Sequence, residues 1–194
     1  MDKNQVINQL IEDNGYSKYL EIGYGNGEGF KSIKCDFKVS CDPSLKETIS
    51  IGSDVVLPVS SDEFFEQANK KKKFHIILID GLHHADQVRK DIINASNVLS
   101  KNGAIVLHDV NPNNKETQSV PCKTAIWEGD CWRAFIGFRF AYPDVETKCY
   151  LDDHGIAVIY PNGEKFEGEF EDMETTYEEF VENKAELLGV NSKN

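Results

Sequence analysis

Acidic side chains end four short apolar runs of this sequence, and histidines flank two of them. The four acids are Glu21, Asp42, Asp80 and Asp109. His83 and His84 closely follow Asp80. His108 directly precedes Asp109. Because histidine titrates near neutral pH and carboxylates bind hard cations, this grouping favours proton transfer, divalent-metal binding, or both.

The glycine-rich stretch after the first apolar run, YLEIGYGNGEGF, predicts a loop that contacts a ligand. Glycines at positions 23, 25, 27 and 29 let the backbone turn sharply and let a ligand approach without a Cβ in the way. Glu28 stands where the dinucleotide fingerprint G-x-G-x-x-G requires a glycine, and the Lys-Ser/Thr pair of a P-loop is missing. Glu21, just before the loop, favours a cationic ligand over a pyrophosphate.

Short runs rich in valine, isoleucine and leucine alternate with stretches of helical period, which is typical of an α/β protein. We expect a three-layer Rossmann-like sandwich, in which a mostly parallel seven-stranded sheet carries helices on both faces and a C-terminal antiparallel hairpin. The expected strands span residues 18–23, 37–42, 54–59, 74–80, 104–109, 145–151 and 155–160. Pro58 indicates that the third strand ends early or lies at an edge. The strand-end acids then meet at the edge where open parallel sheets bind ligands.

Helices are expected over residues 5–14, 60–71, 85–99, 129–140 and 176–190. The third has an apolar stripe that includes Val88, Ile92 and Ala95, and the KNG sequence at 101–103 is its expected C-cap. Residues 164–194 carry ten acidic and three basic residues. We therefore divide the chain into a main domain, residues 1–163, and an acidic C-terminal extension, residues 164–194, whose helix docks on the body or on a partner.

Composition excludes several classes of function. The net charge is −12 and the basic residues form no clustered face, which argues against nucleic-acid binding. No run reaches the roughly 18 apolar residues of a membrane span, and the polar N-terminus lacks the features of a signal peptide. We expect a cytoplasmic protein whose five cysteines are free thiols.

Four motifs in sequence order resemble those of the class I S-adenosylmethionine-dependent methyltransferases. They are LEIGYGNG, VSCDPS, SSDEFF, and IDGLHH with GAIVLHD, and the resemblance covers about residues 18–160. In that family the glycine loop contacts the methionine part of the cofactor, the second strand's acid binds the ribose, and the third motif contacts the adenine. The resemblance implies S-adenosylmethionine as cofactor, bound by Glu21, Gly23, Tyr24, Gly25, Gly27, Asp42, Ser61, Asp62 and Asp80.

The strand-end acids are also similar to those of metal-assisted small-molecule O-methyltransferases, such as the catechol and macrolide-sugar enzymes, and of the cephalosporin-hydroxylase-like group. The resemblance implies that Asp80 and Asp109 hold Mg²⁺ or another divalent metal, with His108 as a third ligand. His108 departs from the family pattern, in which an acid is more usual at that position. His84 or His108 would act as the base, and Asp109 would also be catalytic.

We predict methyl transfer from S-adenosylmethionine to a small hydroxylated acceptor, with a sugar or natural-product intermediate as the first candidate. Two alternatives stay open: a non-catalytic module that binds the cofactor or recruits a partner, and a metal-dependent hydroxylase or hydrolase that uses the same acids. Trp127 and Trp132, with Arg133, fit an acceptor pocket or the core equally well, and Asp130 fits a helix cap equally well. The oligomeric state is open, a homodimer included.

Overall fold

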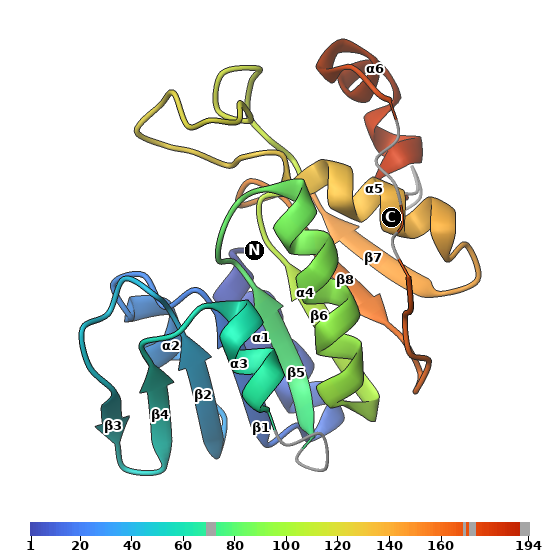
Figure 1. The fold of residues 1–194 in the computed structure, drawn as a ribbon. Coiled ribbons are helices and arrows are strands. Elements are labelled where there is room, and N and C mark those ends of the chain that lie inside the picture. The colour runs from blue at the N-terminus through green and yellow to red at the C-terminus, as the bar shows by residue number, and fades with distance from the viewer. Residues whose placement is uncertain (69–72, 169, 171–173, 191–194) are drawn as a thin grey trace.

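The computed structural model describes residues 1–68, 73–168, 170 and 174–190, and eight strands form one sheet within them (Figure 1). The strand order is β3-β4-β2-β1-β5-β6-β8-β7. The bounds are β1 Lys18–Ile22, β2 Phe37–Cys41, β3 Ile49–Ile51, β4 Asp54–Leu57, β5 Phe74–Ile79, β6 Leu99–Leu107, β7 Glu146–Tyr150 and β8 Ile156–Tyr160. The five strands from β4 to β6 in this order are parallel, whereas β3, β8 and β7 each pair antiparallel.

The predicted fold class is confirmed, with one strand more than the seven expected. The additional strand, β3, turns back through Gly52 and pairs antiparallel with β4, so that Ile51 lies opposite Asp54. β4 ends at Leu57, directly before Pro58, as the proline predicts. It does not lie at the edge of the sheet, because β3 covers it.

Helices cover both faces of the sheet (Figure 1). Their bounds are α1 Lys3–Asn14, α2 Glu28–Ser32, α3 Ser61–Gln67, α4 Ala85–Val98, α5 Cys131–Ala141 and α6 Tyr177–Leu187. Side chains of α1 and α2 form one core with the sheet, and those of α3, α4 and α5 form the other. The expected helix over 60–71 is observed as α3, and positions 69–71 lie outside the described residues. No helix in the described ranges is long and apolar enough to cross a membrane.

Strand β5 shows why this sheet is buried on both faces. Ile76 and Leu78 point into the core that contains α1, whereas Ile77 and Ile79 point into the core that contains α4. All four are at most 3% exposed. The sequence of a strand buried on both faces is a continuous apolar run. Asp80, the first polar residue after this run, therefore lies where the carboxyl end of β5 leaves the core.

The described part of residues 164–190 packs on the body of the protein. Phe166 and Phe180 are fully buried in the same core as α4 and α5. The rings of Phe180 and Trp132 lie 4.4 Å apart between centroids, and the Phe166 amide donates to Ser96 Oγ at 3.1 Å. The expected docking of the terminal helix is therefore on the body, while the domain boundary after residue 163 stays a prediction.

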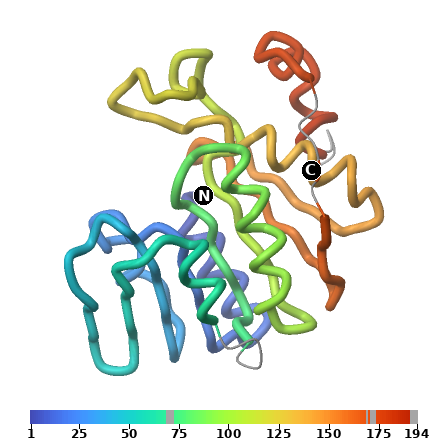
Figure 2. The backbone as a smooth tube through the Cα atoms, viewed as in Figure 1, coloured from blue at the N-terminus to red at the C-terminus, as the bar shows by residue number. Residues whose placement is uncertain are grey.

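One long segment and the N-terminus lie at the edge of the sheet where the parallel strands end. Figure 2 shows residues 111–130 projecting beyond the carboxyl ends of these strands. The start of α1 lies at the same edge. These two parts frame the ends of β1, β5 and β6, from which the predicted site residues come.

Candidate functional site

The end of β1 packs directly against the turn that follows β5. Gly23 adopts a φ of 95°, and a Cβ on it would lie 2.1 Å from the carbonyl oxygen of Asp80. The Asp80 amide donates to the Ile22 carbonyl at 2.9 Å. Because only glycine permits this approach, the glycine loop and the strand-end acid are brought together at one edge.

Asp42 follows β2 and holds the glycine loop. Its Oδ2 accepts hydrogen bonds from the amides of Tyr24 and Gly25, each at 3.0 Å. Its Oδ1 accepts from the amide and the hydroxyl of Ser44, at 2.9 and 2.6 Å. Burial alone would raise the pKa of the Asp42 carboxyl, but these four hydrogen bonds outweigh burial and lower the pKa. Asp42 is therefore an ionised acceptor beside the loop.

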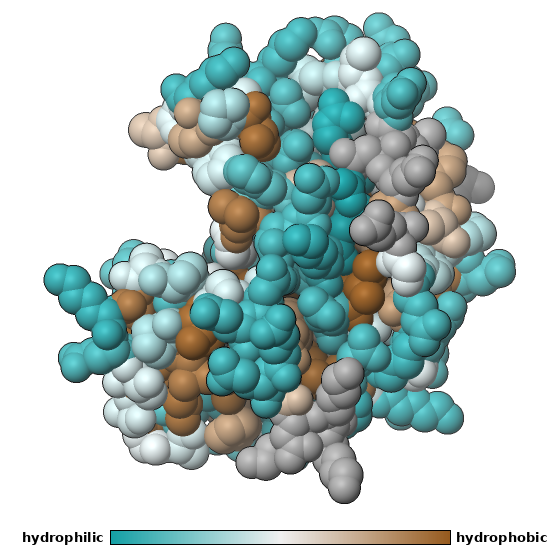
Figure 3. Space-filling view, in the orientation of Figure 1, coloured by the Kyte–Doolittle hydropathy of each residue, from teal (hydrophilic) through white to brown (hydrophobic). Residues whose placement is uncertain are grey.

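A cavity of about 400 Å³ lies along these strand ends. Its lining includes six predicted cofactor residues: Gly23, Gly25, Asp42, Ser61, Asp62 and Asp80. Gln87 of α4 closes the α3 side, because its Nε2 donates to Ser61 Oγ at 3.1 Å and to Asp62 Oδ1 at 3.0 Å. In Figure 3 the surface is hollowed between the 111–130 segment and the part of the molecule that holds β2 to β4.

A second cavity, of about 370 Å³, adjoins the first, because Gly23, Gly25 and Asp80 line both. Glu21, at the end of β1, lines this second cavity and is only 4% exposed. Burial raises the pKa of the Glu21 carboxyl to about 7 even though the Tyr19 hydroxyl donates a hydrogen bond to it. The second cavity therefore has an acid in its wall that titrates near neutrality.

Tyr24 and Gly27 complete the predicted glycine loop. Tyr24 lines the second cavity, and its ring packs edge-on against Phe30, with centroids 5.6 Å apart. A Cβ on Gly27 would lie 2.3 Å from the Tyr24 ring. Gly27 is outside the described lining of both cavities, so its contact is with the tyrosine.

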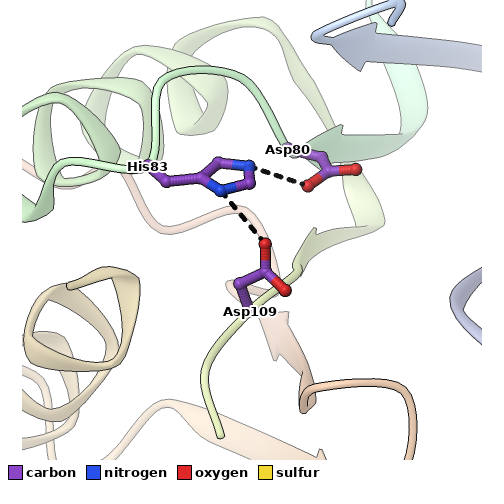
Figure 4. Close-up of side chains that lie close together, drawn as sticks. All are labelled: Asp80, His83 and Asp109. Carbon is purple, nitrogen blue, oxygen red and sulfur yellow. Dashed lines mark ion pairs between the residues drawn. The ribbon is translucent and has the colours of Figure 1, made fainter. Parts of the chain in front are cut away.

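Three side chains from beyond the ends of β5 and β6 converge next to the cavities (Figure 4). Asp80 Oδ1 lies 3.4 Å from His83 Nε2. Asp109 Oδ2 lies 3.2 Å from His83 Nδ1. One oxygen or nitrogen of each lies within 4.8 Å of the others, which is close enough for a single divalent cation to take all three as ligands.

His108 also contacts both carboxylates. Its Nδ1 lies 3.2 Å from Asp80 Oδ1 and 3.4 Å from Asp109 Oδ1, and its Nε2 lies 2.8 Å from the Asp153 carbonyl oxygen. Burial alone would lower the pKa of His108, but the hydrogen bond to Asp80 and the nearby carboxylates raise it. Since both ring nitrogens face acceptors, His108 acts here as a proton-carrying donor.

The two carboxyl groups of this cluster differ in how readily they ionise. Burial alone would raise the pKa of Asp80, but hydrogen bonds from His108 and His83 hold it well below its usual range. Burial raises the pKa of Asp109 to about 6. Asp109 also adopts a φ of 60°, a left-handed conformation that is uncommon outside glycine and often found at functional sites.

His83, rather than the predicted His84, is brought to the carboxylates. His84 is the N-cap residue of α4, and its ring meets Trp127 edge-on at 5.7 Å between centroids. Within the described residues, the side chain of His84 forms no hydrogen bond or ion pair with Asp80 or Asp109. Trp127 also lies against His83, at 5.5 Å, so this tryptophan belongs to the site.

The second tryptophan and Asp130 have structural roles. Trp132 is fully buried in the core, and the Arg133 guanidinium lies 4.4 Å from the centroid of its ring. Asp130 Oδ1 accepts a hydrogen bond from the Ala85 amide at 2.6 Å. Asp130, the residue directly before α5, therefore caps the start of α4. This contact ties the 111–130 segment to the site.

Lys3, Glu128 and His154 also lie around the site, and the sequence analysis did not predict them. Lys3 Nζ forms an ion pair with Asp80, 77 residues away. The buried Glu128 binds Nδ1 of His154, 26 residues away. No local spacing reveals such pairs, although polar residues inside the long 111–130 segment are a weak signal for Glu128.

Comparison with known proteins gives a match over part of the chain. Residues 40–110, less than half of the chain, match a family model described as a methyltransferase domain. Over these residues the chain is similar to methyltransferase domains. The match begins in β2, ends just after β6 and includes Asp42, Asp80 and Asp109. It confirms the predicted resemblance to class I S-adenosylmethionine-dependent methyltransferases and the predicted enzyme class.

Solved structures of methyltransferases share the fold of this chain at low sequence identity. The O-methyltransferase from Bacillus cereus, in complex with SAH, is 13% identical with a TM-score of 0.56 over 81% of this chain and 80% of that chain. The O-methyltransferase TomG from Streptomyces achromogenes, in complex with SAM, is 13% identical with a TM-score of 0.55 over 81% and 78%. The MycE methyltransferase, in complex with Mg, SAH and mycinamycin VI, is 16% identical with a TM-score of 0.57 over 80% and 48%. A search of the curated proteins found no match.

Proposed function

We propose that this methyltransferase transfers the methyl group of S-adenosylmethionine to a hydroxyl group of a small acceptor. The observation that carries the proposal is the meeting of two cavities at Gly23, Gly25 and Asp80, with the Asp80, His83 and Asp109 cluster next to that junction. A nucleoside with an amino-acid tail needs two joined compartments, and a reacting hydroxyl needs titratable groups beside them.

The first cavity suits the nucleoside part of the cofactor. Gly25 adopts a φ of 53°, and a Cβ on it would meet nothing within 4 Å, so a bound ligand can occupy that space. Asp42 supplies an ionised carboxylate for the ribose hydroxyls. Of its four present donors, only the Ser44 hydroxyl can rotate away to make room for them. Ser61 and Asp62 lie where polar contacts to the adenine are expected.

Methyl transfer requires in-line attack on the sulfonium methyl, so the chain must orient the acceptor and remove its proton. Trp127, from the 111–130 segment, lies beside His83 and meets His84 edge-on, and its ring offers apolar surface for a ring of the acceptor. The acceptor class that we propose is a sugar or a natural-product intermediate with a free hydroxyl group.

The candidate bases differ in whether they can accept a proton. His108 faces acceptors with both ring nitrogens, which suits the role of positioning Asp80. Asp109, whose pKa burial raises to about 6, can take a proton near neutral pH. His84 is the other candidate because it lies beside Trp127, next to the space proposed for the acceptor. We propose Asp109 as the base if no metal is bound, His84 as the base if a metal takes Asp109 as a ligand, and His108 as the group that holds Asp80.

The residues present also fit a divalent metal. Asp80, His83 and Asp109 offer oxygen and nitrogen ligands within 4.8 Å of one another, a donor set that suits Mg²⁺ through its oxygens and borderline ions through its nitrogen. We propose His83 in place of the predicted His108 as the third ligand. When bound, such an ion would lower the pKa of the acceptor hydroxyl.

Titration calorimetry with S-adenosylmethionine tests the proposal. We expect binding by the wild-type chain and at least a tenfold weaker affinity for Asp42→Ala, because a charge-assisted hydrogen bond contributes about 1.5–3 kcal/mol. Asp36→Ala, which removes an exposed acid just before β2, is the matched control. Equal affinity of Asp42→Ala and wild type would refute the assignment of the ribose site.

Turnover separates the remaining alternatives. Release of S-adenosylhomocysteine in the presence of catechols or sugars supports an O-methyltransferase, and its stimulation by Mg²⁺ supports the metal. Cofactor binding without turnover on any acceptor favours a non-catalytic module. Failure to bind the cofactor, with metal-dependent turnover of other substrates, would favour a hydroxylase or hydrolase.

A further inference from the structure

The second cavity has a charge pattern that suits an amino-acid zwitterion. Its described lining contains three acids, Glu21, Glu28 and Asp80, and a single cation, Lys3. An α-ammonium group entering this space finds carboxylates in excess. An α-carboxylate finds one positively charged partner there, and without it would face like charges only.

Lys3 is held in position at the start of α1. Its backbone amide donates to Asp153 Oδ2 at 2.8 Å, and Asp2 caps the helix by accepting from the Gln5 amide at 2.8 Å. The Lys3 side chain is 24% exposed. The ion pair with Asp80 therefore holds the Lys3 ammonium group at the cavity wall.

The ion pair between Lys3 and Asp80 leaves room for a ligand. An ammonium group has three N–H donors, and the contact with Asp80 Oδ2 uses one. Asp80 Oδ1 points the other way, toward His83 and His108. An amino-acid zwitterion can therefore lie alongside this ion pair, with its α-carboxylate next to Lys3 and its α-ammonium group next to Asp80.

Asn4 adds an independent sign that a donor is missing from this cavity. Asn4 lines the cavity, and its Oδ1 is buried without a hydrogen-bond partner in the described residues. It faces α2, because a Cβ on Gly29 would lie 3.5 Å from this oxygen. An unmet buried acceptor is costly, and rotation of the Asn4 side chain toward the cavity would let an α-ammonium group supply the N–H donor that this oxygen lacks.

We propose that Lys3 binds the α-carboxylate of the cofactor's methionine end, while Asn4 and Asp80 bind its α-ammonium group. This inference rests on the proposed function, since it assigns one end of the ligand whose nucleoside lies in the first cavity. It predicts that the chain selects adenosyl amino acids over adenosyl thioethers that lack the amino-acid group.

Calorimetry with two ligands tests the proposal on the full chain. S-adenosylhomocysteine carries the amino-acid end, whereas 5′-methylthioadenosine has the same nucleoside and sulfur without it. For Lys3→Met we expect affinity for S-adenosylhomocysteine to fall by about 10- to 100-fold, the range for a lost charge-assisted hydrogen bond. Affinity for 5′-methylthioadenosine should stay within about twofold, and Lys3→Arg should recover most of the loss.

Asn4→Ala should show the same selective loss to a smaller extent. Lys31→Met is the matched control, because it removes an exposed lysine from neighbouring α2 and should leave both affinities unchanged. Circular dichroism of each variant checks the fold.

Two results would overturn the inference alone. One is an equal loss of affinity for both ligands in Lys3→Met, which would show a structural role. The other is unchanged affinity for both. If wild type binds neither ligand, the proposed function fails, and the inference fails with it.

Discussion

The raised pKa of the Asp91 carboxyl, next to Gln87 in the wall of the first cavity, can be tested quantitatively. Asp91 lies on α4, is 1% exposed, and accepts a hydrogen bond at 3.1 Å from Gln87, the residue that also binds Ser61 and Asp62. Burial raises the pKa of the Asp91 carboxyl from 3.8 to about 7, despite the hydrogen bonds from Ser61 and Gln87. The folded state therefore holds this proton more tightly than the unfolded state does.

The consequence for stability follows from proton linkage. Because the folded pKa lies above the unfolded one, Asp91 lowers the stability of the wild type progressively as the pH rises from about 4 to about 7, and by a constant amount above that. A difference of roughly three pKa units corresponds to about 4 kcal/mol. Asp91→Asn keeps the shape and the hydrogen-bonding capacity but cannot ionise, so it should gain that amount relative to wild type between pH 4 and pH 8.

Urea denaturation of both proteins at a series of pH values measures this gain. The difference in unfolding free energy between Asp91→Asn and wild type should increase with pH and level off above about pH 7. Asp86→Asn, in the exposed first turn of the same helix, controls for the loss of one negative charge. A difference that does not change with pH would refute the assignment of a buried carboxyl that titrates near neutrality.

Two further substitutions test the packing around the site. Gly23→Ala should lower the free energy of unfolding by more than about 3 kcal/mol, because its Cβ would lie 2.1 Å from the Asp80 carbonyl oxygen at a positive φ. Thermal unfolding measures this loss. The control is Gly52→Ala, whose Cβ would meet nothing within 4 Å and which should cost only about 1 kcal/mol. Similar losses for both would contradict the close approach. Phe180→Ala should lower the free energy of unfolding by roughly 3–5 kcal/mol and expose α6 to proteases. Val181 is 47% exposed, so Val181→Ala should do neither. Equal protease sensitivity of the two variants would contradict the docking of α6.

The central strands and their acids could be predicted because one physical cause determines both. Strands such as β5 are buried on both faces, so their sequence is a continuous apolar run that ends abruptly at Asp80. The glycine loop could be predicted as well, because its four glycines follow a buried strand directly in the sequence. Both features are visible in a short stretch of the chain.

Other features depend on tertiary pairing and could not be predicted. The KNG sequence at 101–103 does not cap α4, which ends at Val98. Leu99 enters β6 at once and pairs with Phe74, and Gly103 is needed because a Cβ there would lie 2.6 Å from the His75 carbonyl oxygen. β3 is only three residues long and exists because β4 pairs with it.

The site shows the same division between local and long-range information. The sequence indicates that histidines follow β5, but whether His83 or His84 faces the carboxylates depends on the direction of one turn. Lys3 reaches Asp80 across 77 residues, and no periodicity connects them. Residues that come together only through the fold were therefore the ones missed.

The divided carboxylate of Asp80 has a thermodynamic consequence. Its Oδ2 faces Lys3 and the second cavity, whereas its Oδ1 faces the histidines and Asp109. A ligand that changes the charge at one oxygen changes the affinity at the other, and this coupling is reciprocal by the same factor. Ligands bound on the two sides of Asp80 should therefore change each other's affinity through this single side chain.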